Sequence, residues 1–265
     1  MSAQPRYVSQ LKGQKAVIIG GSSGLGFAVA SALIEEGASV VISSSNRSKL
    51  DDAVKRLNDP KLQYNADSSR VSAKLCNLQG EGMEESLASL FSSVGGFDHL
   101  IHTAGDPLAI SPLEQASYHQ ILKAGEVRFF SAILAAKTAQ PHLRKSGSIT
   151  LTTGSISVSP RPDWAIISGF AGGLISLGRQ LAYDLSKYDL RVNVVSPGGV
   201  ETELWNGMPQ DKRQKTFEAM SQRALTGKIA QPHEVAQTYI GLLKDTNITA
   251  QTIYTDSGAL YGPRP

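Results

Sequence analysis

Apolar and polar positions follow two alternating periods along the chain. Short runs of consecutive apolar residues, typical of strands buried on both faces, occur at residues 15–20, 39–43, 71–76, 99–102, 148–153, 191–196 and 251–255. Longer segments with apolar residues three or four positions apart, the period of a helix, lie between them at 24–36, 50–57, 84–94, 118–139, 166–185 and 232–244. This alternation predicts an α/β domain whose doubly wound parallel sheet is covered by helices on both faces.

Composition narrows the class of protein. The 265 residues are 41% hydrophobic and 18% charged, which suits one globular domain, and the net charge of +3 is too weak and scattered to favour nucleic acid. The lone Cys76 has no neighbours at metal-ligand spacing, so we expect no metal. No apolar stretch approaches the roughly 18 residues of a membrane span, and the first 15 residues lack the core of a signal sequence. We therefore expect no membrane partner and a cytoplasmic location.

A glycine-rich turn, Gly20-Gly21-Ser22-Ser23-Gly24-Leu25-Gly26, joins the first predicted strand to the first helix. Glycines let the backbone turn sharply and approach a pyrophosphate, whose charge the helix N-terminus stabilises. A triphosphate P-loop is not predicted, because Phe27 stands where its lysine would follow. The turn predicts a Rossmann fold that binds a dinucleotide through Gly20, Ser22, Ser23, Gly24, Leu25 and Gly26.

The end of the second predicted strand indicates which dinucleotide is bound. A domain that binds NAD places an acidic residue there for the ribose 2′-hydroxyl. Here the chain runs Ser43-Ser44-Ser45-Asn46-Arg47, with no carboxylate before Asp51. Hydroxyls, an amide and a guanidinium suit a 2′-phosphate, so Ser44, Ser45, Asn46 and Arg47 predict NADP(H). An ordinary polar turn is the alternative.

Further motifs resemble those of the short-chain dehydrogenase/reductases over nearly the whole chain. The glycine turn is similar to that family's Thr-Gly-x-x-x-Gly-x-Gly, with Ile19 in place of Thr, and His102-Thr103-Ala104-Gly105 resembles its Asn-Asn-Ala-Gly. Asp256-Ser257-Gly258 is similar to its C-terminal Asp-Gly-Gly. The resemblance implies that the protein is a homotetramer. It also implies further cofactor contacts after the third, fourth and sixth strands, from Asn77, Leu78, Thr103, Ala104, Gly105, Pro197, Gly198, Val200 and Thr202.

The resemblance fails at the family's catalytic residues. Its Ser follows the fifth strand and its Tyr-x-x-x-Lys opens the next helix, but Gly154, Ile167 and Ala171 stand at those positions here. In ordinary members the tyrosine protonates the oxygen that becomes an alkoxide, a contribution typically worth roughly 10²–10⁴-fold. Hydride addition to a cationic iminium gives a neutral amine and needs no such donor. A carboxylate that stabilises the cation is the useful group there.

The loop after the fifth predicted strand, Pro160-Arg161-Pro162-Asp163-Trp164, supplies candidate catalytic residues. Asp163 would stabilise the cation and Trp164 would cover an aromatic substrate. Arg128 stands where many family members keep an Asn in the long fourth helix. The alternatives are that Asp163 caps a helix and that Arg128 pairs with a surface acid.

With these departures the chain resembles a fungal branch of the family, the reductases of prenylated indole alkaloid pathways that build bicyclo[2.2.2]diazaoctane rings. That resemblance implies NADPH-dependent reduction of a cyclic iminium in an aromatic, indole alkaloid substrate, followed by a guided intramolecular Diels–Alder closure. In this resemblance, an Arg and an Asp of the branch match Arg128 and Asp163. The branch's loop reads Pro-Asp-Pro-Gly-Trp, against Pro162-Asp163-Trp164-Ala165-Ile166 here.

Two other functions remain open. One is a redox-inactive sensor or scaffold that binds NADP(H), and the other is an ordinary ketone reductase that uses Ser155 or His102 as its acid. In every case we expect a single domain over residues 1–265, with a cofactor half at about 12–155. A substrate loop would cover residues 156–166, and a lid would form from the irregular stretch 201–227.

Overall fold

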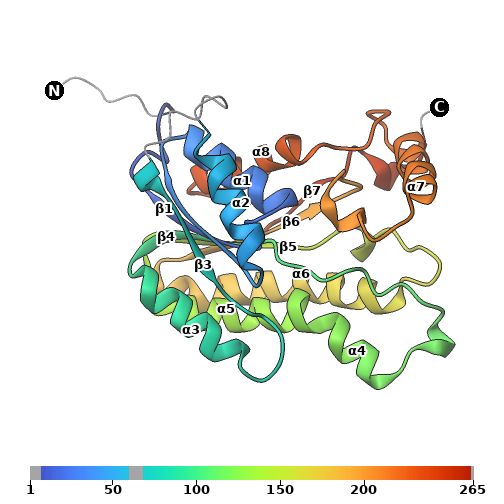
Figure 1. Ribbon diagram of the computed structural model, residues 1–265, viewed down its shortest axis with the longest axis horizontal. Coiled ribbons are helices and arrows are strands. Elements are labelled where there is room, and N and C mark those ends of the chain that lie inside the picture. The colour runs from blue at the N-terminus through green and yellow to red at the C-terminus, as the bar shows by residue number, and fades with distance from the viewer. Residues whose placement is uncertain (1–6, 60–67, 264–265) are drawn as a thin grey trace.

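Within the described residues, seven parallel strands form one sheet in the order β3-β2-β1-β4-β5-β6-β7 (Figure 1). The computed structural model describes residues 7–59 and 68–263, so positions 1–6, 60–67 and 264–265 of the predicted domain lie outside them. The strands are β1 (Lys15–Ile19), β2 (Ser39–Ser44), β3 (Val71–Leu75), β4 (Phe97–His102), β5 (Leu143–Thr152), β6 (Arg191–Pro197) and β7 (Thr252–Thr255). The order reverses between β1 and β4, where sheets of this kind bind ligands at the carboxyl ends of their strands. The predicted fold class is confirmed.

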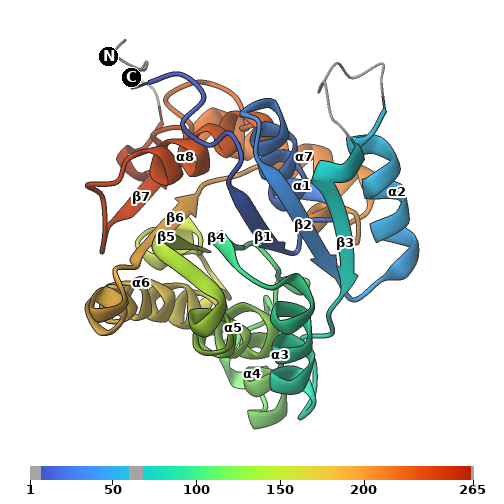
Figure 2. The same cartoon turned by 90° about the vertical axis from the view of Figure 1, so that its left-hand side faces the viewer.

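Helices cover both faces of the sheet. They are α1 (Gly24–Glu35), α2 (Arg47–Leu57), α3 (Met83–Val94), α4 (Tyr118–Gly125), α5 (Ser131–Ala139), α6 (Ala165–Leu185), α7 (Gln210–Arg223) and α8 (Pro232–Lys244). Figure 2 shows α1, α2 and α8 on one side of the sheet and α3, α5 and α6 on the other. Each side has its own apolar core, one around Leu33 and Tyr239, the other around Phe91 and Leu174. Burial on both faces explains why the strands are continuous apolar runs.

Three predicted elements differ from the structure by more than two residues. Helix α2 begins at Arg47, earlier than predicted, because the Asn46 side chain accepts a hydrogen bond from the Lys49 N–H (2.9 Å) and caps it. Strand β5 begins at Leu143 rather than at residue 148. The long helix predicted over 118–139 is divided into α4 and α5 by a π-helical turn, Glu126–Phe130.

The predicted lid, residues 201–227, is less irregular than expected because it contains α7. No residue of α7 is fully buried, and Phe217, Ala219 and Met220 are its only apolar residues. So few apolar positions give little periodic signal in the sequence.

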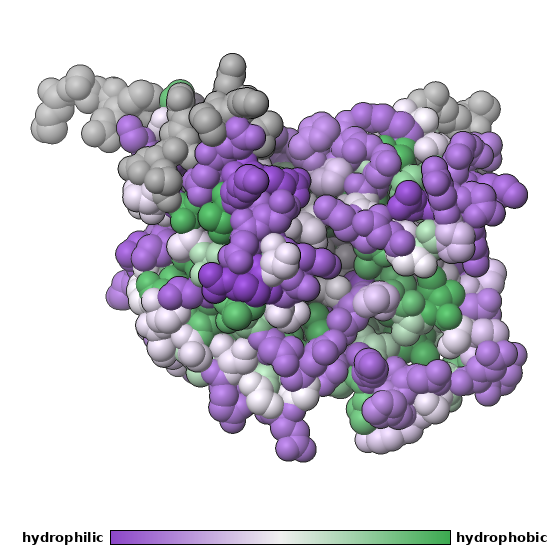
Figure 3. Space-filling view, viewed as in Figure 1, coloured by the Kyte–Doolittle hydropathy of each residue, from purple (hydrophilic) through white to green (hydrophobic). Residues whose placement is uncertain are grey.

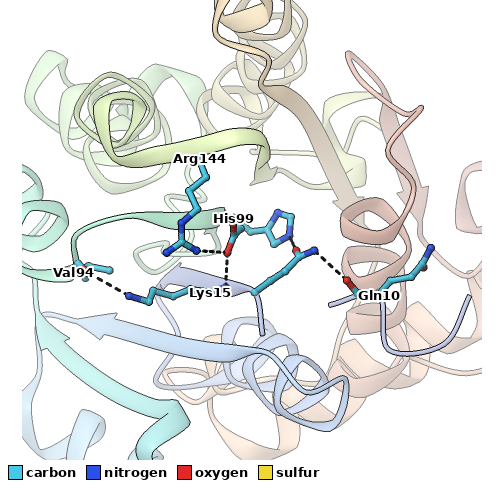
Figure 4. A network of polar contacts seen from close by, with 7 residues as sticks. Gln10, Lys15, Val94, His99 and Arg144 are labelled. Carbon is cyan, nitrogen blue, oxygen red and sulfur yellow. Dashed lines mark hydrogen bonds and ion pairs between the residues drawn. The ribbon is translucent and has the colours of Figure 1, made fainter. Parts of the chain in front are cut away.

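A polar network fixes the strands at their amino ends, opposite the edge where ligands bind (Figure 4). The Asp98 carboxylate accepts a hydrogen bond from the Lys15 backbone N–H (2.7 Å) and forms an ion pair with Arg144 (2.9 Å). The His99 ring bonds the Gln14 side chain. These contacts join the starts of β1, β4 and β5.

One described helix, Ala165–Tyr188, is long and apolar enough to span a membrane by length and composition alone. Its buried residues are spaced by three or four positions, and the helix packs on the sheet beside β6. A core helix of a parallel-sheet domain has this composition too.

Candidate active site

A cleft runs along the carboxyl ends of β1, β2, β4, β5 and β6 and is walled by α6 and by the segment after β6. On the face seen in Figure 3, apolar side chains gather between the polar surfaces of α7 and α4. Every cofactor residue predicted from the sequence lines this cleft except Arg47: Gly20, Ser22, Ser23, Gly24, Leu25, Gly26, Ser44, Ser45, Asn46, Asn77, Leu78, Thr103, Ala104, Gly105, Pro197, Gly198, Val200 and Thr202. The sequence therefore predicted one continuous site.

Two glycines of the first turn are required by their surroundings. A Cβ on Gly26 would lie 2.3 Å from the Gly20 carbonyl oxygen and 2.5 Å from the Thr103 Oγ1. Gly20 has a φ of +86°, and a Cβ there would lie 2.6 Å from the Ala104 backbone nitrogen. The turn therefore packs directly on the segment after β4, which leaves its amides at the mouth of the cleft.

Near the end of β2 the cation that lines the cleft is Lys49, and Arg47 as a ligand of the 2′-phosphate stays a prediction. The Arg47 guanidinium forms an exposed ion pair with Asp51 (3.0 Å) and lies outside the cleft. Lys49, in the first turn of α2, lines the cleft beside Ser44 and Ser45. Because the Asn46 cap starts the helix at Arg47, the turn of the helix directs residue 49 toward the site.

We expect Lys49→Ala to weaken NADPH binding by roughly tenfold, since a cation bound to phosphate contributes more than a neutral hydrogen bond. NADH, which lacks the 2′-phosphate, should bind the variant and the wild type equally. Fluorescence titration of both nucleotides measures this, with Arg47→Ala as the matched control. A larger loss of NADPH affinity in Arg47→Ala than in Lys49→Ala would show that Arg47 binds the 2′-phosphate.

Glu203 lies at the position where a pyrophosphate would be stabilised. Its Oε2 accepts a hydrogen bond from the Gly24 N–H (2.8 Å) at the first residue of α1, and the side chain lines the cleft. The N-terminus of a helix attracts negative charge, so this carboxylate competes with a phosphate for the same amide.

We therefore expect Glu203→Gln to bind NADPH about two- to fivefold more tightly, the usual range for one charge at a helix end. Glu201→Gln is the control, because the Glu201 carboxylate is exposed and bonds Gln231 instead. Isothermal titration of both variants decides the matter. Unchanged or weaker binding by Glu203→Gln would contradict the competition.

The three positions vacated by the family's catalytic residues, Gly154, Ile167 and Ala171, all line the cleft. Ile167 and Ala171 are buried in a small cluster with Ile156, against which Trp164 packs. An apolar wall thus replaces the hydroxyl and ammonium groups of ordinary members. Trp164 lines the cleft, as its predicted role requires.

Arg128 lies in the cleft and is held by the segment after β4. Its Nη2 donates a hydrogen bond to the Asp106 carbonyl oxygen, and its Nε is buried with no partner among the described residues. Burial lowers the pKa of Arg128, and the Asp106 carboxylate opposes that shift. A Cβ on Gly105 would lie 2.7 Å from its Nη1, so glycine is needed there for the guanidinium to fit. Among the described residues, no acidic side chain at the surface forms an ion pair with Arg128.

Asp106 is a cleft residue that the sequence reading missed. Its Oδ2 is buried without a hydrogen bond to any described residue, and its Oδ1 accepts a long bond from Gln79 (3.5 Å). Burial raises the pKa of Asp106, while the nearby Arg128 lowers it. The signal was a carboxylate directly after Gly105, at the end of the fourth-strand motif.

The structure does not place Asp163 in the cleft. Its side chain is exposed, its backbone has a φ of +66°, and its carbonyl oxygen accepts a hydrogen bond from the Ser111 N–H (3.1 Å). It caps no helix either, because Trp164 is the N-cap of α6 and no side chain bonds that end. Arg161, two residues earlier, lines the cleft instead.

The backbone of the substrate loop is left-handed at Asp163, where φ is +66° and glycine would be favoured. The match of Asp163 to the Asp of the alkaloid branch stays a prediction.

Of the two alternative acids, only Ser155 lines the cleft. His102 is buried, its Nε2 bonds the Ser131 Oγ (2.7 Å), and burial lowers its pKa to about 4. A neutral imidazole enclosed in the core cannot protonate a substrate in the cleft.

Comparison with known proteins agrees with the motifs. A family model described as an SDR-like Rossmann domain matches residues 7–261. The short-chain dehydrogenase/reductase malC of Malbranchea aurantiaca is 36% identical over 94% of this chain and 96% of that protein. The short-chain dehydrogenase/reductase fsr5 of Gibberella fujikuroi is 35% identical over 98% of this chain and 99% of that protein.

Solved structures give the same result. The MalC reductase/Diels-Alderase from Malbranchea aurantiaca has a TM-score of 0.88 and 34% identity, covering 96% of this chain and 98% of its own. A small-chain dehydrogenase in complex with NADPH has a TM-score of 0.76 and 25% identity, covering 95% of this chain and 100% of its own.

Proposed function

The chain belongs to the short-chain dehydrogenase/reductases, and from this premise we propose that it is an NADPH-dependent reductase of a cyclic iminium in an alkaloid-type pathway. The observation that carries the proposal is the apolar wall of the cleft, where Gly154, Ile167 and Ala171 replace the family's proton donor and its partners. An acceptor that is already cationic needs no proton as it is reduced. An apolar wall also excludes the water that would hydrolyse it.

The cleft residues divide the work of binding. The glycine turn after β1 suits the pyrophosphate, and the Ser44–Lys49 stretch suits the 2′-phosphate. The segment from Pro197 to Thr202 would hold the nicotinamide end. Bound NADPH supplies the hydride. The Asp106 carboxylate, beside Arg128, stabilises the cationic acceptor, and Trp164 covers its aromatic part.

We also propose that the same wall guides an intramolecular [4+2] cyclisation of the reduced product. The support is the likeness to a reductase/Diels-Alderase and the presence of Trp164 and Ile167 along one side of the cleft. Chiral analysis of the cycloadduct formed with and without the protein tests this step. Identical product ratios would reduce the activity to the reduction alone.

The test of the reduction is single-turnover NADPH oxidation with cyclohexanone and with 1-methyl-3,4-dihydro-β-carboline, an indole-fused cyclic imine, at a pH where the imine is protonated to the iminium. We expect oxidation with the imine and none above background with the ketone. Tight NADPH binding without oxidation by either compound would favour the redox-inactive sensor or scaffold. Turnover of cyclohexanone would favour a ketone reductase with a relocated acid, for which Ser155 and Asp106 are available in the cleft.

The assembly proposed is a homotetramer formed through the long helices. Exposed apolar or aromatic side chains lie along α4, α5 and α6: Tyr118, Ile121, Leu122, Ile133 and Tyr183. Surfaces of this kind are commonly covered in an oligomer. Light scattering after size exclusion measures the mass directly.

A further inference from the structure

Two arginines from different segments meet beside the substrate end of the cleft. Arg161, in the loop between β5 and α6, lines both the cleft and a smaller pocket that opens beside it. Arg223, in the last turn of α7, lines the smaller pocket. The Arg161 guanidinium lies over the Trp164 ring, 5.7 Å from its centroid. The substrate loop and the lid helix therefore each contribute one cation to the same place.

Neither arginine has an ion pair with any described residue. The other charged groups of the smaller pocket are already engaged. Lys228 pairs with Glu234, and the two oxygens of Asp256 accept hydrogen bonds from the backbone N–H groups of Gly258 (3.0 Å) and Leu260 (3.1 Å). The pocket thus has two guanidinium groups without an anionic partner among the described residues, of which Arg161 is partly buried and Arg223 is exposed.

The energetic consequence is visible at Arg161. Burial lowers its pKa, and the charge of Arg223 lowers it further. An anion bound beside Arg161 opposes both effects, since it restores an opposite charge and supplies hydrogen-bond acceptors.

The surroundings also fit an anion attached to an apolar body. Trp164 and Ile167 line the adjoining cleft, and the Ser155 hydroxyl, which lines both spaces, has no hydrogen-bond partner among the described residues. A hydroxyl donor beside two guanidinium forks is a suitable set of groups for a carboxylate.

We propose that Arg161 and Arg223 form an anion subsite that binds a carboxylate on the ligand of this cleft, with the ligand's apolar body against Trp164 and Ile167. The inference rests on the proposed function only in placing that ligand beside the nicotinamide end, and it concerns binding rather than hydride transfer. The cofactor's phosphates do not need these arginines, because the glycine turn and the Ser44–Lys49 stretch lie on other walls of the cleft.

The experiment is isothermal titration of the NADP⁺-loaded protein with indole-3-acetate and with its neutral amide, indole-3-acetamide, at low ionic strength. We expect the acid to bind the wild type at least about tenfold more tightly than the amide, as one charge-assisted contact would give. Arg161→Gln should bring the acid to the level of the amide, and Arg161→Lys should restore part of the difference. Added salt should weaken the acid far more than the amide.

Arg223→Gln should also weaken binding of the acid, whereas Arg213→Gln should not. Arg213 lies on the same helix, and its Nη1 donates to the Asn206 side chain (2.9 Å) away from the pocket. Unchanged NADP⁺ affinity and melting temperature in each variant confirm that the cofactor site and the fold are intact. Equal affinity for acid and amide, no binding of either, or an unchanged acid affinity in Arg161→Gln overturns the subsite. Because no hydride moves in this titration, failure of the reduction cannot produce any of these results.

Discussion

Asp106→Asn should slow reduction of the cyclic imine by on the order of 10²–10³-fold, the usual cost of losing one preorganised electrostatic group. The Asp106 carboxylate lies in the cleft beside Arg128, and one of its oxygens is buried without a partner. A charge in such surroundings acts through little water, so its interaction with a cation is strong. Asp163→Asn should change the rate by no more than about threefold, because exposed charges contribute little. Single-turnover NADPH oxidation measures both.

The control for both variants is cofactor binding. The Asp106 backbone carbonyl, which accepts the Arg128 hydrogen bond, is kept in Asp106→Asn, so NADP⁺ affinity and melting temperature should stay near those of the wild type. A slow Asp163→Asn together with a fast Asp106→Asn would reverse the assignment. It would mean that the substrate loop turns its carboxylate inward when the ligand binds.

Strand and helix order could be predicted because both faces of the sheet are buried, which leaves apolar runs at every strand. The same reasoning explains the element that was missed. Helix α7 buries no residue fully and has few apolar positions, so its sequence carries little periodic signal and was taken as irregular. The start of α2 was missed because it depends on the Asn46 side-chain cap rather than on an apolar position.

The candidate site could be predicted where it depends on turns that directly follow a strand. Gly20, Gly26 and Gly105 are needed by close contacts within such turns, so motif and geometry coincide. The direction of a side chain in a helix or a loop could not be predicted in this way. Whether Arg47 or Lys49 faces the cleft depends on where α2 begins, and this could not be derived from composition.

The substrate loop shows most clearly which side-chain positions the sequence alone does not predict. Asp163 and Arg161 are two residues apart, and sequence alone made Asp163 the better catalyst. The left-handed backbone at Asp163 and the hydrogen bond from Ser111 hold that residue outside the cleft. Contacts between segments distant in the sequence thus determine which charge the ligand meets.

The largest expected effect on stability is destabilisation by acid, caused by two histidines in the sheet. Burial lowers the pKa of both His99 and His102 from 6.5 to about 4. As the pH falls below 6.5 the unfolded chain binds protons first, so stability is complete above that value and is lost as the pH falls toward 4. At pH 5 each histidine should cost about 2 kcal/mol of unfolding free energy. Urea denaturation at pH 7.5 and pH 5 should therefore differ by roughly 4 kcal/mol from this cause.

His102→Gln isolates one of the two contributions. The Gln amide nitrogen can take the place of the His102 Nε2 and still donate to the Ser131 Oγ, which in turn donates to the Val127 carbonyl oxygen (2.5 Å), so the fold should be kept. The difference in unfolding free energy between pH 7.5 and pH 5 should shrink by about 2 kcal/mol relative to the wild type. Comparing variants cancels the carboxylates, which titrate over part of the same range. His119→Gln, at an exposed position of α4, is the control and should keep the full difference. If His102→Gln kept the full difference too, the burial of His102 would not be a source of acid sensitivity.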